Sequence, residues 1–246
     1  VHRAGAAACG FTLVPPRDKW TDCLPPSAND DYEFAVLVLM ICTPATPDSK
    51  IVPFFTKFFR DQHVSAEWVR DNKKKLEGIM AKSSLGRHKK NTEFIIAASD
   101  LCLAWGRVPR DYTELKDIKG VADKVALVTV HTAFGLTQGI AVDVHMLRIF
   151  RELGWYPGFK LSYKNERELC RSGVEGWFPF SEWGDMNRVY AGLGQLLNDK
   201  ESRQLVVDFF LEQTLAEDSE CRKEDFQRIL SVAKLYSYKY SEEEEY

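Results

Sequence analysis

A continuous apolar stretch, YEFAVLVLMIC from Tyr32 to Cys42, is the strongest single constraint on the fold of this chain. It predicts a central buried helix, which the proline-rich TPATP segment ends. Other apolar residues recur at helical spacing, and the alternating pattern of strands is essentially missing. We therefore expect an all-α fold of two helical lobes with a cleft between them. The expected helices cover residues 32–42, 52–60, 91–105, 125–134 and 144–153, a helix capped by Ser65, and further helices within 161–197 and 203–215.

The helix expected after residue 143 has clear start and stop signals. Asp143 stands at its N-cap position, and Gly154 is placed to end it. The side chains expected to line its buried side are Val144, Leu147, Ile149, Phe150 and Leu153.

Charge is distributed unevenly along the chain. The net charge of −3 excludes the overall basic field that many nucleic-acid-binding proteins have. Residues 73–90, however, include seven basic residues and only one acidic residue, Glu77. The chain ends in the acidic sequence SEEEEY. The basic stretch is either a solvated face or a phosphate-contacting surface. Its members are Lys73, Lys74, Lys75, Lys82, Arg87, Lys89 and Lys90.

Cysteine spacing predicts reduced thiols and an intracellular protein. The six cysteines show no CxxC or zinc-binding spacing, so we expect neither a disulfide framework nor a metal site. No apolar run approaches the roughly 20 residues needed to span a bilayer, so we expect no membrane partner.

We divide the chain into an extended N-terminal tail (residues 1–30), a helical region (31–215) and a C-terminal helix with an acidic tail (216–246). Such tails bury too little surface to offset their ordering entropy, so ordered tails would be held either by a large protein or RNA assembly or by packing on the protein's own surface or in a crystal. The first residue is Val1 rather than methionine, which fits either a removed targeting peptide or a partial chain.

The segment LKDIKGVADKVA, residues 115–126, predicts a helix, a tight turn and a second helix. Leu115 and Ile118 form the apolar end of the first helix, and Lys124 opens the second. In the turn, outward-pointing amides and the positive end of the second helix favour phosphate binding. The residues expected to contact phosphate here are Lys119, Gly120, Val121 and Ala122.

Lys124 and Asp143 are the candidate catalytic residues. Separately, Lys124 is explained as a surface or phosphate-contacting lysine, and Asp143 as a helix cap. Together they could catalyse a reaction, because a desolvated lysine amine can attack a sugar carbon while a nearby carboxylate stabilises the developing cation.

Residues 106–155 resemble the helix-hairpin-helix core of endonuclease III, of the HhH-GPD superfamily of base-excision DNA glycosylases. The motifs that carry the resemblance are GxVP at Gly106–Pro109, the hairpin, TAFG at Thr132–Gly135 and AVDxH at Ala141–His145. A wider resemblance runs from about Tyr32 to Asn198. It implies the two-lobed HhH-GPD fold, with Lys124 as the Schiff-base nucleophile and Asp143 assisting departure of the base.

The chain departs from the family pattern at its DNA-facing positions. Ala122 and Asp123 stand where the hairpin usually has a second glycine and a basic or small polar residue. Pro44 occupies the place of a glutamine that fills the gap left by a flipped base. Asn198 stands where the first thiolate of a [4Fe–4S] cluster would be, and only Cys221 follows, so we expect no iron–sulfur cluster and no other cofactor.

Two functional hypotheses follow. In the first, which we favour, the fold has become a nucleic-acid-binding structural component of a large ribonucleoprotein, with catalysis weak or lost. The hairpin and the basic stretch would contact DNA or RNA phosphates, and a mitochondrial ribosome is the specific hypothesis. In the second, the chain is an active DNA glycosylase and AP lyase that uses Lys124 and Asp143.

An aromatic cluster leaves one further question open, because it is either packed in a core or part of a partner-docking face. Its members are Trp155, Tyr156, Trp177, Phe178, Phe180 and Trp183.

Overall fold

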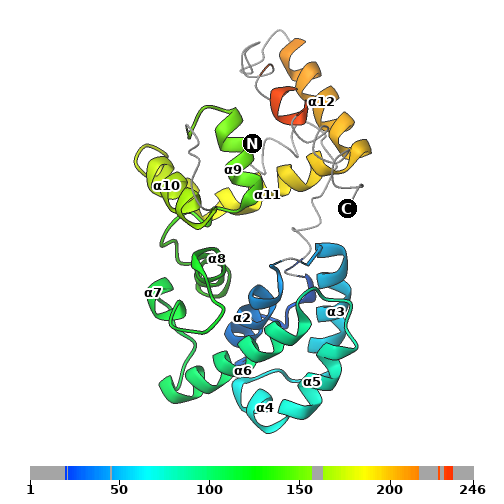
Figure 1. The fold of residues 1–246 in the computed structure, drawn as a ribbon, viewed down its shortest axis with the longest axis vertical. Helices are drawn as coiled ribbons and strands as arrows, with labels where there is room; N and C mark the ends of the chain where they lie inside the picture. Colours follow the sequence, from blue (N-terminus) through cyan, green and yellow to red (C-terminus); the bar gives the residue numbers. More distant parts are fainter. Residues whose placement is uncertain are drawn as a thin grey trace. The chain divides into compact units, whose positions relative to one another are not determined.

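The computed structural model describes residues 20, 22–44, 46–156, 163–215, 227 and 230–234. Every regular element within these ranges is a helix, which confirms the all-α prediction (Figure 1). Most of both predicted tails lies outside the described residues, so the domain boundaries at residues 30 and 216 and the partner expected to hold the tails stay predictions.

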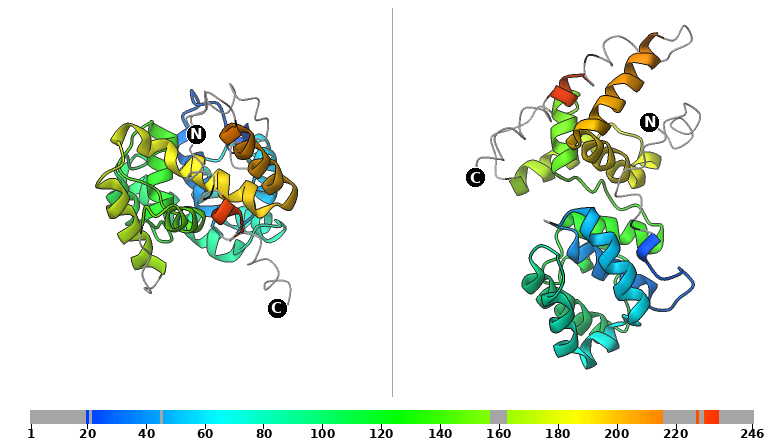
Figure 2. Two further views of the ribbon diagram at one scale, coloured as in Figure 1. Left: turned by 90° about the horizontal axis from the view of Figure 1, so that it is seen from above. Right: turned by 90° about the vertical axis from the view of Figure 1, so that its right-hand side faces the viewer.

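The chain divides into two compact units at Ala141 and Val142, which confirms the expectation of two lobes. The N-terminal unit, Pro16–Ala141, contains α2 (Tyr32–Cys42), α3 (Asp48–Asp61), α4 (Ala66–Asp71), α5 (Lys73–Ala81), α6 (His88–Trp105), α7 (Tyr112–Leu115) and α8 (Asp123–Phe134). The C-terminal unit, from Val142 on, contains α9 (Val144–Glu152), α10 (Tyr163–Glu175), the 3₁₀ turn η2 (Phe180–Glu182), α11 (Trp183–Asn198) and α12 (Lys200–Leu215). Figure 2 shows the helices of each unit from two further directions.

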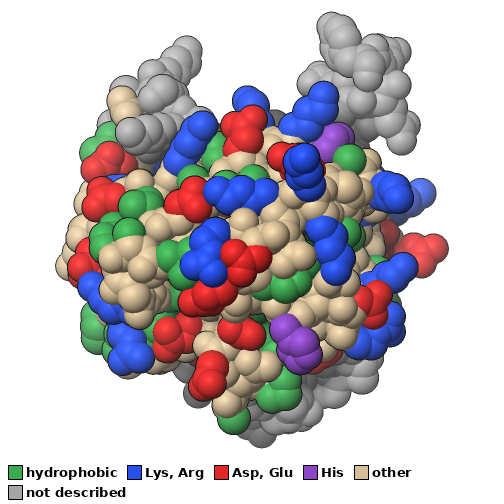
Figure 3. Space-filling view, turned by 90° about the horizontal axis from the view of Figure 1, so that it is seen from below, with side chains coloured by type: hydrophobic (Ala, Val, Ile, Leu, Met, Phe, Trp, Pro, Cys, Tyr) green, Lys and Arg blue, Asp and Glu red, His purple; other side chains and the backbone are tan. Residues whose placement is uncertain are grey.

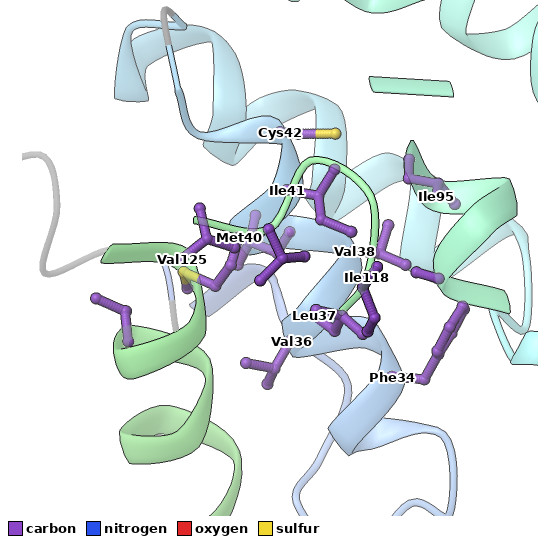
Figure 4. Packing of buried hydrophobic residues seen from close by; sticks show 14 of the residues in the cluster. Phe34, Val36, Leu37, Val38, Met40, Ile41, Cys42, Ile95, Ile118 and Val125 are labelled. Atoms are coloured by element: carbon purple, nitrogen blue, oxygen red, sulfur yellow. The ribbon is translucent and has the colours of Figure 1, made fainter. Parts of the chain in front are cut away.

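Helix α2 is the centre of the N-terminal unit, as its sequence predicts. All nine residues from Phe34 to Cys42 are buried, and the helix packs against α3, α6 and α8. Figure 4 shows Ile95 of α6, Ile118 of the turn and Val125 of α8 among the α2 side chains. Full burial of each large aliphatic side chain contributes about 1.5–3 kcal/mol, so α2 fixes the positions of the elements around it.

Two helices of this unit begin earlier than their apolar patterns predict. Helix α3 starts at Asp48 and accommodates Pro53 inside it, although an interior proline costs about 3 kcal/mol. Burial of Phe55 and Phe58 offsets that cost. Helix α6 starts at His88, because the N–H of Asn91 donates to the carbonyl of Arg87 at 3.0 Å and closes an additional turn.

Helix α9 in the C-terminal unit begins and ends at the expected signals, but its buried side differs. Oδ1 of Asp143 accepts a hydrogen bond from the N–H of Met146 at 3.0 Å, and Gly154 ends the segment with φ of +73°. Val144, expected to be buried, is 37% exposed, because the buried stripe begins two residues later. That stripe consists of Met146, Leu147, Ile149 and Phe150.

The aromatic cluster is divided between core and surface. Tyr156 is buried, and Trp155 packs against rings of Phe150 and Tyr190. Trp177 and Phe180, by contrast, are 53% and 60% exposed. Among the described residues, none of the helices combines the length and apolarity that crossing a bilayer requires.

Candidate nucleic-acid interface

The predicted hairpin is present between α7 and α8. Helix α7 ends at Leu115, so Ile118 lies in the turn rather than in the helix, where its side chain is fully buried. The side chain of Val121 is also buried, and its N–H donates to the carbonyl of Ile118 at 3.0 Å. Two apolar anchors and one turn hydrogen bond thus fix the backbone from residue 118 to residue 121.

Gly120 is required in this turn for two reasons. Its φ of +90° lies in the left-handed region, which L side chains rarely adopt. Its Cα also lies against the ring of Phe94 on α6, so that an added Cβ would stand 2.6 Å from Cε2 and closer still to two other ring atoms. The hairpin therefore rests directly on α6.

The exposed residues of the turn include backbone donors without an acceptor in the described part of the chain. Lys119, Gly120 and Ala122 are exposed, and within the described residues no hydrogen bond joins their N–H groups to another part of the chain. Ala122 is also the N-cap of α8 and supplies no side-chain cap. These amides are suited to bind an anion at the positive end of α8. Val121 departs from the expectation, because its amide is used inside the turn.

Part of the basic stretch lies beside the hairpin. Nζ of Lys119 is 3.6 Å from Oε2 of Glu93 on α6. Lys89 and Lys90 precede Glu93 by four and three residues, so they lie on the same side of α6, one turn from the hairpin contact. Both are exposed, and within the described residues no ion pair or hydrogen bond engages their side chains. We call the amides of residues 119, 120 and 122, together with Lys89 and Lys90, the hairpin surface.

Arg87 begins the same helix. It is exposed and adopts φ of +57° at the N-cap of α6.

The start of the basic stretch lies elsewhere. Nζ of Lys73 is 3.3 Å from Oδ1 of Asp100, which is ten residues beyond Lys90 and so about 15 Å along α6. Nζ of Lys75 donates to Oε1 of Gln62 at 2.8 Å and lies over the ring of Trp68. Lys74 is exposed on α5. On the face shown in Figure 3, basic side chains are interspersed with acidic ones.

The two candidate catalytic residues belong to different units. Lys124 is in the first turn of α8, four residues after Gly120, and is neither fully buried nor fully exposed. Asp143 is buried and caps α9 in the C-terminal unit. The structure thus assigns Asp143 a structural role and leaves its chemical role a prediction.

The expectation that the chain carries no iron–sulfur cluster stays a prediction. Within the described residues, no group of three or more His, Cys, Asp or Glu side chains is placed to hold a metal ion. Asn198 ends α11, and the one cysteine after it, Cys221, lies outside the described residues. The described thiols are buried, and desolvation raises the pKa of Cys23, Cys102 and Cys170 to about 12. These three thiols are therefore protonated at neutral pH.

No family model matches the chain. Among curated proteins, it is 37% identical over 94 residues to endonuclease III homolog 2, chloroplastic, of Arabidopsis thaliana, which covers 37% of this chain and 24% of the relative. It is 26% identical over 186 residues to endonuclease III homolog 1 of Saccharomyces cerevisiae. That match covers 71% of this chain and 45% of the relative. The matched region thus spans less than half the length of these relatives.

Among solved structures, the fold matches that of a non-covalent endonuclease III–DNA complex with a TM-score of 0.58. The match covers 96% of this chain and 99% of that chain at 18% sequence identity, so the likeness concerns the fold.

Proposed function

Since this chain is an endonuclease III-like member of the HhH-GPD superfamily, we propose that it binds nucleic acid through backbone phosphates with its hairpin surface. The observation that carries the proposal is the exposed set of amides at Lys119, Gly120 and Ala122, which lies beside Lys89 and Lys90. Amides and cations contact phosphate without reading base sequence, so DNA and RNA duplexes of unrelated sequence should bind similarly. The similar endonuclease III fold was solved in complex with DNA, which supports this assignment.

We further propose that catalysis is weak or lost and that the protein is a nucleic-acid-binding structural component of a large organellar ribonucleoprotein, specifically a mitochondrial ribosome. Support comes from departures from the family pattern: Ala122, Asp123 and Pro44 stand where the resemblance to endonuclease III implies a glycine, a basic or small polar residue and a glutamine, respectively. Two of the similar Arabidopsis proteins are named as chloroplastic, which supports an organellar setting.

An active DNA glycosylase and AP lyase is the second candidate. It is favoured by the retention of Lys124 in the first turn of α8 and of Asp143 at the start of α9. In this mechanism the Lys124 amine attacks C1′ of the target nucleotide, the base departs, and the carboxylate of Asp143 stabilises the cationic transition state.

Borohydride trapping on duplexes that contain abasic sites or oxidised pyrimidines separates the two candidates. The structural proposal predicts binding without a covalent adduct. An adduct that forms with the unaltered protein and disappears in Lys124→Ala would instead establish the enzyme. Asp143→Asn is the matched companion variant, because an amide oxygen can still cap α9 while the carboxylate charge is lost.

Sedimentation tests the proposed assembly. Tagged full-length protein should travel with mitochondrial ribosomal particles in a sucrose gradient and move to the top after RNase treatment. Sedimentation as a free protein in both gradients would contradict the ribonucleoprotein proposal, whatever the trapping result.

A further inference from the structure

An ion pair closes the mouth of the hairpin. Nζ of Lys116, just after α7, is 2.7 Å from Oδ1 of Asp123, the first residue of α8. The side chains are 42% and 32% exposed, respectively. Lys116 also lies over the ring of Tyr112, 5.6 Å from its centroid, so its ammonium is held between an acid and an aromatic ring.

The fold does not depend on this ion pair. The hairpin is already anchored by the buried side chains of Ile118 and Val121 and by the contact of Gly120 with Phe94. Oδ1 of Asp123 is itself buried, but both side chains remain partly exposed, and an ion pair that water reaches stabilises a fold only slightly. The pair should therefore be removable without unfolding the hairpin.

The location of Asp123 matters more than its stabilising effect. Its carboxylate is one residue beyond the exposed amide of Ala122 and at the positive end of α8. That end favours any anion, so the carboxylate occupies the environment that an incoming phosphate would need. It repels the phosphate and at the same time engages Lys116, which precedes the turn.

We propose that the Lys116–Asp123 pair limits the affinity of the hairpin for phosphodiester backbones. Asp123 competes with the phosphate for the positive end of α8. It also holds Lys116 in an ion pair, so that Lys116 does not contact the phosphate. This inference rests on the proposed function, since it concerns the strength of binding at the hairpin surface.

The decisive variant is Asp123→Asn, which keeps the shape of the side chain and removes its charge. We expect its affinity for a 20-base-pair DNA duplex at 50 mM salt to rise about 5- to 20-fold, because repulsion ends and Lys116 becomes available. The slope of log K against log salt should steepen by about 0.9, the value for one additional phosphate contact.

Two companion variants separate the effect of lost repulsion from the effect of a newly available Lys116. Lys116→Ala should weaken binding about 3- to 10-fold, because Asp123 loses its counter-ion. Asp123→Asn combined with Lys116→Ala should keep the gain from lost repulsion but return the salt slope to its original value. Circular dichroism and urea midpoints close to those of the unaltered protein would show that the fold is unchanged.

The outcomes distinguish this inference from the proposed function. If the unaltered protein binds the duplex and Asp123→Asn binds within twofold of it, the inference is overturned and the proposed function stands. If neither protein binds, both fall. A rise in affinity with the steeper slope supports both.

Discussion

Replacing Gly120 with alanine should destabilise the protein by about 2–3 kcal/mol. A non-glycine residue in the left-handed region costs about 1–2 kcal/mol, and Gly120 has φ of +90°. The new methyl group would overlap the ring of Phe94, and overpacking of this kind costs about 1–3 kcal/mol. The smaller entropy of the unfolded alanine chain returns about 0.4–1 kcal/mol.

Urea denaturation of the full chain, followed by circular dichroism, measures this loss. With a slope of about 2–3 kcal/mol/M, the midpoint should fall by about 1 M. Gly78→Ala is the matched control. Gly78 is in the middle of α5 with nothing within 4 Å of an added Cβ, so this variant should gain about 0.5–1 kcal/mol.

A second background isolates the steric part. In Phe94→Leu the ring is absent, so Gly120→Ala should cost about 1–3 kcal/mol less than in the unaltered protein. An equal cost in both backgrounds would refute the packing of Gly120 on Phe94. A Gly120→Ala midpoint within about 0.2 M of the original would refute the backbone argument as well.

Four further predictions concern other parts of the molecule. The thiols of Cys23, Cys102 and Cys170, whose pKa burial raises to about 12, should not react with a thiol reagent at pH 8 until urea unfolds the protein. Asp111→Ala should lower the urea midpoint by about 0.4 M, because Oδ1 of Asp111 accepts from the N–H of Thr113 at 2.7 Å and caps α7. Hydrogen bonds from Thr113 lower the pKa of Asp111, so its contribution is complete above its unfolded pKa near 3.9 and is lost as pH falls through the folded value. Asp111→Asn should therefore lose less stability than the unaltered protein between about pH 4 and pH 2. Elemental analysis of the purified protein should find far less than one iron per chain, and four per chain would contradict the ligand count.

The elements that the sequence predicts well are those fixed by local rules. Tyr32–Cys42 was predicted with the observed bounds, because an apolar run that ends at prolines leaves little choice of location. Asp143 and Gly154 mark the limits of α9 for similarly local reasons, since a cap and a left-handed glycine act within one turn. Pro53 misled the prediction of α3, because tertiary burial of the phenylalanines outweighs the local cost of an interior proline.

The site was less predictable, because it depends on contacts between distant segments. The sequence indicates that Gly120 turns the chain, but nothing local shows that Phe94 packs beneath it. The sequence also contains the basic stretch, yet only the packing of the hairpin on α6 separates Lys89 and Lys90 from Lys73, which pairs with Asp100. The Lys116–Asp123 ion pair joins the two sides of a turn, and no fixed residue spacing in the sequence predicts such a pair.

The salt dependence of duplex binding tests the central claim most directly. The claim is that Lys89 and Lys90, beside the exposed hairpin amides, contact backbone phosphates. Lys89→Ala combined with Lys90→Ala should reduce the slope of log K against log salt by about 2, equally for duplexes of unrelated sequence. The control, Lys50→Ala combined with Lys57→Ala, removes two positive charges from α3 instead. It should leave the slope nearly unchanged. Equal slopes for all three proteins, or the larger reduction in the α3 variant, would contradict the account.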